Sequence, residues 1–282
     1  MRALLVALLL LIGSLAPLTT AASDDIDPPA GETSEAPVYL ALGDSLAFGA
    51  GASNPLETGY VPLLHASLRE RIPCGQGGQG GCPRLRLVNL AEIGATTTTL
   101  LQTQLPRALA LIEQRNNDGD PGNDVVVITI DIGGNDAVHA LLDVCSASIS
   151  AACGRAVQQT LATVGANLTT ILTQLRVAAG PDTRIAIMTY YNSFLACDQR
   201  DFAANADLVL EGLTGLFPGL NDVIRLAAEL TDATVADTFG KLDASDLAGG
   251  TDCLHANDAG YQKITQLFLS ALVADREPAI AR

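Results

Sequence analysis

Residues 125–130 read Val125-Val126-Val127-Ile128-Thr129-Ile130 and are apolar at every position but one. A strand with one face in solvent alternates apolar and polar residues, whereas a continuous apolar run is typical of a strand that is buried on both faces. We therefore expect residues 125–130 to form a central strand of a parallel sheet that helices cover on both sides.

Short apolar segments of the same kind lie on both sides of this strand and alternate with longer segments of helical periodicity. Such alternation favours an α/β domain with a central five-stranded parallel sheet. The predicted strands are 38–42, 85–90, 125–130, 184–189 and 233–236, and the predicted helices are 59–71, 98–115, 154–178, 201–230 and 258–274, with Asn257 as the N-cap of the last helix.

The N-terminal residues have the features of a secretory signal peptide. Arg2 is followed by an apolar run over residues 3–13 and by smaller residues over 14–22. This run is shorter than the roughly 20 residues needed to cross a bilayer, so we expect export to the periplasm or the extracellular medium and no membrane anchor. The predicted organisation is a signal peptide (1–22), a mobile acidic and Pro-rich leader (23–37), one folded domain (38–275) and a loose tail (276–282).

The charge of the chain excludes several classes of partner. With 16 Lys and Arg against 31 Asp and Glu, the formal net charge is −15, which disfavours binding to nucleic acid or to an anionic membrane surface. Only 4% of the residues are aromatic and Trp is absent, so platforms that stack on bases or sugars are poorly supplied. After the signal region, no apolar run is long enough for stable insertion into a membrane.

The six cysteines favour disulfides, because their number is even and export leads to an oxidising compartment. Two pairs are close in sequence and are flanked by Gly or small residues suited to loops, which leaves a third pair, although other connectivities are open in principle. The expected disulfides are Cys74–Cys82, Cys145–Cys153 and Cys197–Cys253.

A metal ion or cofactor is not expected. The sequence has no Cys-x-x-Cys motif, and its three histidines do not stand at ligand spacing from the cysteines, which argues against zinc. Residues 116–124 are rich in Asn and Asp and offer oxygen ligands to calcium, but they lack the closing Glu of a calcium-binding loop. We interpret residues 116–124 as a solvated turn.

Two motifs near opposite ends of the chain offer the groups of a hydroxyl-activating triad. In an open parallel sheet, functional groups gather beyond the carboxyl ends of the strands. The first predicted strand leads into Gly43-Asp44-Ser45-Leu46, and a serine becomes a nucleophile when a base removes its proton. Asp252-Cys253-Leu254-His255 places a carboxylate three residues from an imidazole, so one ring nitrogen can bind the acid while the other faces Ser45. His65, inside an amphipathic helix, and His139, without an acid partner, are weaker candidates for the base.

Two further turns offer hydrogen-bond donors for a developing negative charge, which acyl transfer requires. Gly94 follows the second predicted strand, and a glycine lets its backbone N–H approach a ligand closely. Gly133-Gly134-Asn135-Asp136 follows the third predicted strand and adds an amide side chain. Each of the four motifs alone is also compatible with an ordinary turn or helix cap.

Taken together and in this order, the four motifs closely resemble the SGNH hydrolase superfamily, also called GDSL esterases and lipases, over about residues 38–275. The resemblance implies a flavodoxin-like three-layer α/β/α sandwich with Ser45 as nucleophile, His255 as general base and Asp252 as the acid. It assigns the oxyanion hole to the backbone N–H groups of Ser45 and Gly94 and to the Asn135 side chain. Two details depart from the commonest pattern, and neither removes a catalytic group: Ile93 precedes Gly94, and Cys253 lies between the acid and the base.

The resemblance predicts a secreted serine esterase or lipase that cleaves carboxylic esters through an acyl-enzyme intermediate. The expected substrate is a small-molecule or lipid ester, no cofactor is implied, and we expect a monomer. The export signal and six cysteines look like those of secreted bacterial lipases of this superfamily. Two alternatives stay open: a carbohydrate acetylesterase on the same catalytic frame, and a noncatalytic extracellular binding module.

Overall fold

Five parallel strands form the central sheet of the computed structural model, which describes residues 36–72, 81–144, 150–197, 200–212 and 217–273. The sheet confirms the five predicted strands, with ends that differ by one residue at most. The strand order is β2-β1-β3-β4-β5, so β3 lies at the centre as expected from its apolar run. The strands are β1 (Val38–Gly43), β2 (Arg86–Asn89), β3 (Val125–Asp131), β4 (Arg184–Met188) and β5 (Thr234–Ala236), and all neighbouring pairs are parallel.

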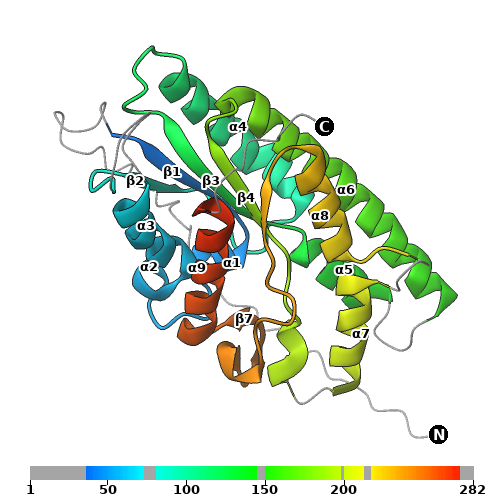
Figure 1. The fold of residues 1–282 in the computed structure, drawn as a ribbon. Coiled ribbons are helices and arrows are strands. Elements are labelled where there is room, and N and C mark those ends of the chain that lie inside the picture. Colours follow the sequence, from blue (N-terminus) through cyan, green and yellow to red (C-terminus); the bar gives the residue numbers. More distant parts are fainter. Residues whose placement is uncertain (1–35, 73–80, 145–149, 198–199, 213–216, 274–282) are drawn as a thin grey trace, which may run out of the picture. The chain divides into compact units, whose positions relative to one another are not determined.

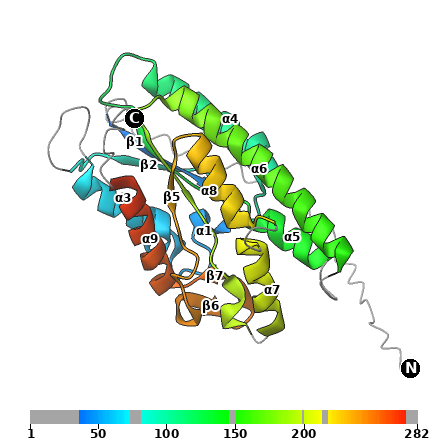
Figure 2. The ribbon, with the colours of Figure 1, turned by 45° about the vertical axis from the view of Figure 1, so that its right-hand side comes forward.

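Helices cover both faces of the sheet and complete a three-layer α/β/α sandwich (Figures 1 and 2). One layer contains α3 (Tyr60–Arg71) packed against α9 (Asp258–Val273). The other contains α4 (Thr97–Asn116), α6 (Ala151–Ala179) and α8 (Leu220–Leu230), with α6 in contact with both of the others. Asn257 caps α9 as predicted, since its Oδ1 accepts from the backbone N–H groups of Ala259 and Gly260.

The remaining elements gather near the carboxyl ends of the strands. They are α1 (Ser45–Phe48), α2 (Pro55–Thr58), α5 (Gly134–Val144), α7 (Arg200–Glu211), the 3-10 turns η1 (Ser193–Ala196) and η2 (Ala244–Asp246), and an antiparallel hairpin of β6 (Leu247–Gly249) and β7 (Asp252–Ala256). The chain adds β2 on one side of β1 and β3 on the other, so the topological switch point lies between β1 and β3. Ligands bind at such points in open α/β sheets.

The single helix predicted over residues 201–230 is wrong, because the segment forms two helices, α7 and α8. Gly212 follows α7 with φ +66°, a conformation that side chains rarely adopt. A Cβ atom on Gly212 would stand 2.3 Å from the backbone oxygen of Phe217, so the chain folds back closely here. Pro218 and Gly219 then precede α8, and apolar periodicity alone did not register these breaks.

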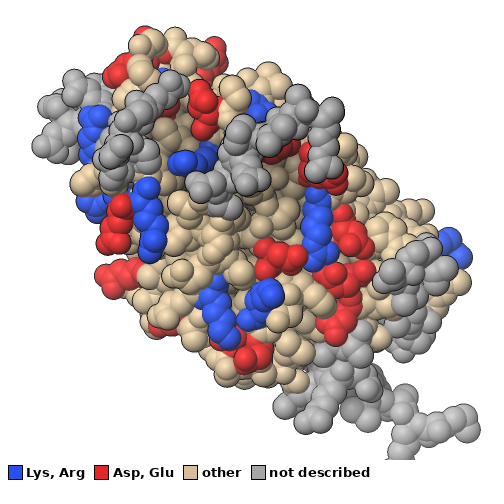
Figure 3. All heavy atoms as spheres, in the orientation of Figure 1, with Lys and Arg blue, Asp and Glu red and all other residues tan. Residues whose placement is uncertain are grey.

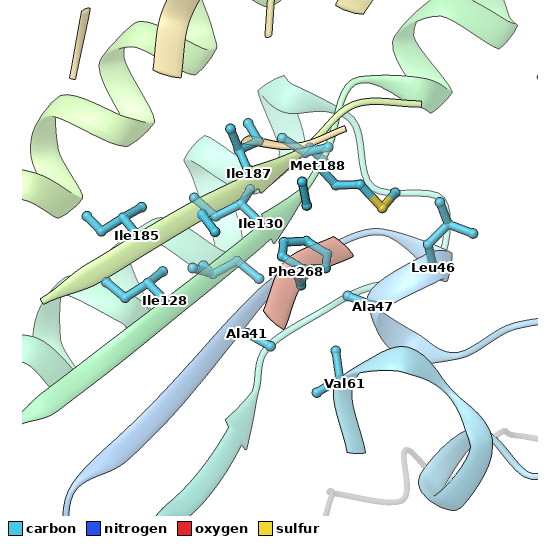
Figure 4. Close-up of a cluster of buried hydrophobic side chains, with 14 of the residues drawn as sticks. Ala41, Leu46, Ala47, Val61, Ile128, Ile130, Ile185, Ile187, Met188 and Phe268 are labelled. Atoms are coloured by element: carbon cyan, nitrogen blue, oxygen red, sulfur yellow. The ribbon is translucent and has the colours of Figure 1, made fainter. Parts of the chain in front are cut away.

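The hydrophobic core extends from the sheet to the turn after β1. Figure 4 shows Ile130 and Met188 from the strands in one cluster with Leu46 and Ala47 of α1. Leu46 is 4% exposed and Ala47 is 1% exposed. Because burial of a leucine side chain contributes about 1.5–3 kcal/mol, the residues after Ser45 are anchored by the same packing that stabilises the sheet.

The face of the molecule drawn in Figure 3 shows Lys and Arg side chains scattered among Asp and Glu rather than gathered in one patch. In the part of the chain that the structure describes, no helix is long and apolar enough to span a membrane. Residues 1–35 and 274–282, which include the predicted signal peptide and tail, lie outside the described residues, so those two assignments stay predictions.

Candidate active site

Ser45 lies in a tight turn between β1 and α1. Asp44 caps α1, and its Oδ1 accepts from the Leu46 N–H at 2.9 Å. Gly43 has φ +151°, and a Cβ atom there would stand 1.9 Å from Oδ1 of Asp131. The turn therefore requires glycine at this position, both for its backbone conformation and for the close approach of a carboxylate. Ser45 itself is 8% exposed.

Two amide side chains that the sequence analysis did not single out hold this turn. Gln104, fully buried on α4, accepts from the Gly43 N–H at 2.9 Å and donates to the Gly43 carbonyl oxygen at 2.8 Å. Asn89, at the end of β2, donates to the Ala47 carbonyl oxygen at 2.8 Å. The only signal for Gln104 in the sequence is a polar residue on the buried stripe of an amphipathic helix.

The hairpin brings His255 and Asp252 to Ser45 across 210 positions of the sequence. His255 Nε2 lies 2.8 Å from Ser45 Oγ, and His255 Nδ1 lies 2.9 Å from both carboxylate oxygens of Asp252. A carboxylate accepts from Nδ1–H, which leaves Nε2 to accept from the serine hydroxyl. Hydrogen bonds thus connect the three side chains in the order Ser45, His255 and Asp252.

Asp252 is held in its charged form by its neighbours. Burial alone would raise the pKa of this carboxyl, but hydrogen bonds from the Leu254 N–H, the His255 ring and the His255 N–H outweigh burial and place its pKa below the usual value. Its side chain is 34% exposed. An ionised Asp252 can orient His255 and stabilise the positive charge that forms when the imidazole takes a proton.

The two predicted donor turns lie next to each other. Asn135, at the start of α5, donates through Nδ2 to the Ala95 carbonyl oxygen at 2.9 Å, which links it to the loop that carries Gly94. Gly94 has φ +77°, a backbone conformation that favours glycine, although no atom lies within 4 Å of the position that a Cβ would take. Glycine is therefore favoured at this position by its backbone conformation, and a side chain would meet no steric clash. Asp136 ties α5 to α4 by accepting from the N–H and hydroxyl of Thr97 at 2.9 and 2.7 Å.

A pocket that is partly open to solvent lies beside Ser45 and His255. Ser45, His255 and Asn135 line it, whereas Gly94 is not among its lining residues. Its other walls are mainly apolar and come from α5, η1, α7 and the hairpin, and they include Val138, Phe194, Val209, Leu210 and Leu254. The pocket is therefore suited to an apolar group attached to the atom that Ser45 would attack.

Two buried acids lie beneath Ser45, and the sequence analysis assigned a role to neither. Asp44 is 2% exposed and Asp131, the last residue of β3, is 0% exposed. Burial raises the pKa of both carboxyls. The neighbouring charge of Asp44 raises that of Asp131 further, well above its usual value. A carboxyl at the end of an otherwise apolar central strand is the signal that could have drawn attention to Asp131.

The predicted disulfide between Cys197 and Cys253 is confirmed and links the loop after η1 to β7 across 56 positions. Cys82 and Cys153 are also disulfide-bonded. Their expected partners, Cys74 and Cys145, lie outside the described residues, so those two pairings stay predictions. Because Cys253 adjoins Asp252, the confirmed bridge ties the acid of the triad to the wall of the pocket.

The other histidines have no place in this site. His65 is half-buried and its Nε2 lies 2.7 Å from the Leu85 carbonyl oxygen, as expected for a histidine satisfied within a helix packing face. His139 is exposed on α5. Among the described residues, no group of three or more His, Cys, Asp or Glu side chains is arranged to hold a metal ion.

Solved structures similar to this one include three hydrolases. A lipase from a goat rumen metagenome aligns with 18% identity over 83% of this chain and 97% of its own, with a TM-score of 0.57. An acetylxylan esterase from Geobacillus stearothermophilus aligns with 18% identity over 87% of this chain and 98% of its own, with a TM-score of 0.55. An α/β hydrolase from the metagenome of Lake Arreo, Spain, aligns with 21% identity over 86% of this chain and 98% of its own, with a TM-score of 0.51. These likenesses establish a shared three-layer fold.

The comparison with curated proteins gave no match. A family model, described as GDSL-like Lipase/Acylhydrolase, matches residues 39–268. The matched region begins inside β1 and ends inside α9, and it contains all four turns that meet around Ser45. Since this match covers most of the chain and the architecture agrees with it, the chain belongs to the GDSL-like lipase/acylhydrolase family.

Proposed function

We propose that the protein is a secreted hydrolase of carboxylic esters in which Ser45 is the nucleophile, His255 the general base and Asp252 the acid that orients it. The observation that carries this proposal is the uninterrupted hydrogen bonding from the Ser45 hydroxyl through His255 to Asp252, at 2.8 and 2.9 Å. A hydroxyl next to an imidazole that a carboxylate holds in one tautomer is activated for acyl transfer.

In the proposed reaction, His255 Nε2 takes the hydroxyl proton as Ser45 Oγ attacks the ester carbonyl carbon. The proton then passes to the leaving alcohol, which leaves an acyl group on Ser45. Water attacks this acyl-enzyme, gives a proton to His255, and the carboxylic acid departs as Ser45 recovers its proton. The Ser45 and Gly94 N–H groups and the Asn135 amide stabilise the oxyanion. One such donor typically contributes ~100- to 1000-fold in turnover.

The pocket supports an acyl group longer than acetyl. An acetyl group leaves the side chains of Phe194, Val209 and Leu210 uncovered, whereas an alkyl chain buries them and gains about 25 cal/mol for each Å² of apolar surface removed from water. We therefore propose small-molecule or lipid esters with an extended acyl chain as substrates. The structural likeness to an acetylxylan esterase supports the alternative, a carbohydrate acetylesterase.

The substrate class can be tested with a series of p-nitrophenyl esters from acetate to decanoate, with acetylated xylan as a separate substrate. The proposal predicts that kcat/KM rises beyond acetate and then falls when the chain outgrows the pocket. Val209→Phe, which narrows the pocket, should move the optimum to shorter chains. A preference for acetate together with release of acetate from xylan would establish the alternative.

Export is part of the proposal. The Cys197–Cys253 disulfide suits an oxidising compartment, and the N-terminal sequence has the features of a signal peptide. We propose cleavage near residue 22, an acidic leader up to residue 37, a catalytic domain over 38–275 and a monomeric mature protein. Mass spectrometry of protein recovered from the medium or periplasm tests the cleavage site, and size-exclusion chromatography with light scattering tests the monomer.

Ser45→Ala is the direct test of the reaction. It should lower turnover of a short chromogenic ester by at least about 10⁴-fold while the melting temperature stays near that of the wild type. Ser270→Ala, which removes an exposed hydroxyl on α9 that bonds only within its helix, is the matched control and should leave turnover unchanged. Activity retained by Ser45→Ala, or failure of an organophosphonate to label Ser45, would support a noncatalytic binding module instead.

A further inference from the structure

Asp44 and Asp131 are two buried acids that both bond to the turn carrying the proposed nucleophile. The Asp44 N–H donates to the Asp131 carbonyl oxygen at 3.1 Å, and the charge of the Asp44 carboxyl acts on that of Asp131. Asp44 also accepts from the Leu46 N–H at 2.9 Å and from the Tyr190 hydroxyl at 2.8 Å. Asp131 accepts from the Ala47 N–H at 3.1 Å and from the Tyr60 hydroxyl at 2.9 Å. Two neighbouring carboxyls that are both buried and bonded only to neutral donors favour the state in which one of them carries a proton.

Among the described residues, no Lys or Arg side chain bonds to either carboxyl of the pair. The titratable groups that act on it are phenols from four parts of the fold and one imidazole: Tyr39, Tyr60, Tyr190, Tyr191, Tyr261 and His255. Burial raises the pKa of each of these phenols, so they stay neutral. Two neighbouring carboxylates in such a site oppose each other's ionisation, which favours a proton on one of them at neutral pH.

We propose that Asp44 and Asp131 together keep a single proton, carried mainly by Asp131, and that this pair positions Ser45. The inference rests on the proposed function for its effect on catalysis, but not for the protonation state itself. Asp131 is therefore a positioning residue that acts through the turn and touches no substrate.

The pair fixes the backbone on both sides of Ser45. The Asp44 N–H donates to the Asp131 carbonyl oxygen at 3.1 Å, the Leu46 N–H donates to Asp44, and the Ala47 N–H donates to the carboxyl of Asp131. None of these bonds uses the Ser45 N–H, which is left for the oxyanion. The close approach of Asp131 to Gly43 means that a larger residue at either position would displace the turn.

The shared proton also sets the charge near the reaction. A single negative charge on Asp44 attracts the imidazolium that His255 becomes when it accepts the Ser45 proton, and the two groups interact through their charges in this structure. A second charge on Asp131 would oppose the negative oxyanion that forms next to Ser45. The protonated Asp131 thus supplies acceptors for Tyr60 and Ala47 without adding that charge.

Infrared spectroscopy tests the protonation state independently of activity. Wild-type protein at neutral pH should show the carbonyl stretch of a buried protonated carboxylic acid, and this band should be missing from Asp131→Asn. Its absence from the wild type would overturn the proposal. The same band is expected in Ser45→Ala, so a failure of the proposed reaction and a failure of the shared proton give different results.

The pH dependence of stability provides a second readout. Because the folded pair keeps a proton that the unfolded carboxyls lose above about pH 4, wild-type stability should fall as the pH rises from there toward the raised pKa of the pair. Asp131→Asn removes this loss, so its melting temperature relative to wild type should increase by at least about 3 °C between pH 5 and pH 8. Glu113→Gln, an exposed site on α4, controls for net charge and should show no such trend. An equal trend in both variants would contradict the proposal.

The positioning role is tested by comparing Asp131→Ala with Asp131→Asn. Alanine leaves the Ala47 N–H and Tyr60 hydroxyl without an acceptor and should lower kcat at least ~10-fold with little change in KM, because the turn moves and the pocket does not. Asparagine keeps one acceptor and one donor and should restore most of kcat. Equal kcat for Asp131→Ala and wild type would overturn the positioning role. If Asp131→Ala does not fold, a kcat for Asp131→Asn as low as that of Asp252→Asn would also overturn it.

Discussion

Ser45 lies between two regions that hold its neighbours by different means. On the sheet side, Asp44 and Asp131 are almost completely buried and bond to the backbone of the turn. On the hairpin side, the side chains of Asp252 and His255 are 34% and 19% exposed. There a two-stranded hairpin and a disulfide to Cys253, in place of deep burial, support the groups.

The difference shows how the environment of an aspartate decides what it can do. Burial keeps a proton on the sheet-side pair, whereas hydrogen bonds from Leu254 and His255 keep Asp252 charged despite its partial burial. The sheet side therefore fixes geometry and the hairpin side supplies charge. We expect damage to the hairpin side to remove activity without unfolding the domain, and damage to the sheet side to affect both.

Asp252→Asn should give the largest effect. The amide keeps the shape of the carboxylate but no longer stabilises the imidazolium or fixes the tautomer of His255, and we expect kcat to fall by about 10⁴-fold. Steady-state kinetics on a soluble ester and circular dichroism measure the loss and the intact fold. Asp243→Asn, an exposed cap next to the hairpin, is the control. A fall no larger than that of the control would remove the distinction between the two sides.

Removal of the disulfide should have the next largest effect. In a Cys197→Ser/Cys253→Ser variant, we expect a loss of about 2–4 kcal/mol in the free energy of unfolding, or roughly 5–15 °C in Tm, because the unfolded chain regains the freedom of a long loop. Calorimetry measures this. On heating, the variant should lose activity at a lower temperature than that at which the sheet core unfolds, since the hairpin loosens first. Coincident loss of both would show that the two sides are one cooperative unit.

The smallest expected effect is on how stability depends on pH. Asp252→Asn on the hairpin side and Asp131→Asn on the sheet side should change this dependence in opposite directions. The pKa of Asp252 is lowered in the folded state, so its contribution is present above the unfolded value and is lost as the pH falls through the folded pKa. Asp252→Asn should therefore cost stability at about pH 7 and progressively less as the pH falls through the lowered pKa of Asp252, a small effect because the group is solvent-screened. Asp131→Asn should show the opposite trend. Thermal melts of both variants across this range test the comparison, and parallel curves would refute it.

The strands were predictable from the sequence because local residue patterns mark them. Apolar runs predict β1, β3 and β4 to within one residue, since a buried parallel strand has few polar positions. The edge strand β2 is predicted as closely, although it contains Arg86 and Asn89 and is only partly buried. The hairpin was not predicted, because β6 is short and contains Gly249, and β7 contains the polar residues Asp252 and His255, so neither has an apolar run. The break between α7 and α8 was missed because apolar spacing continues across Gly212 and Pro218.

The residues of the candidate site were predictable where the sequence offers few candidates for a role. Three histidines leave few choices for a base, and Gly43-Asp44-Ser45-Leu46 is a distinctive neighbour for a nucleophile. The supporting groups were not predictable, because their contacts span long distances along the chain. Gln104 reaches Gly43 across 61 positions, and Asp131 reaches Ala47 across 84. No local pattern in the sequence encodes such a pairing.

The separation of Ser45 from His255 by 210 positions has a practical consequence for preparing the protein. Under the proposed mechanism, titration of Ser45 with an organophosphonate counts only molecules in which the first strand and the last hairpin have met, so it measures complete folding rather than total protein. A fragment that stops before β7 keeps every strand of the sheet and still scores zero. Quality control of refolded or exported material can therefore be reduced to a single stoichiometric assay.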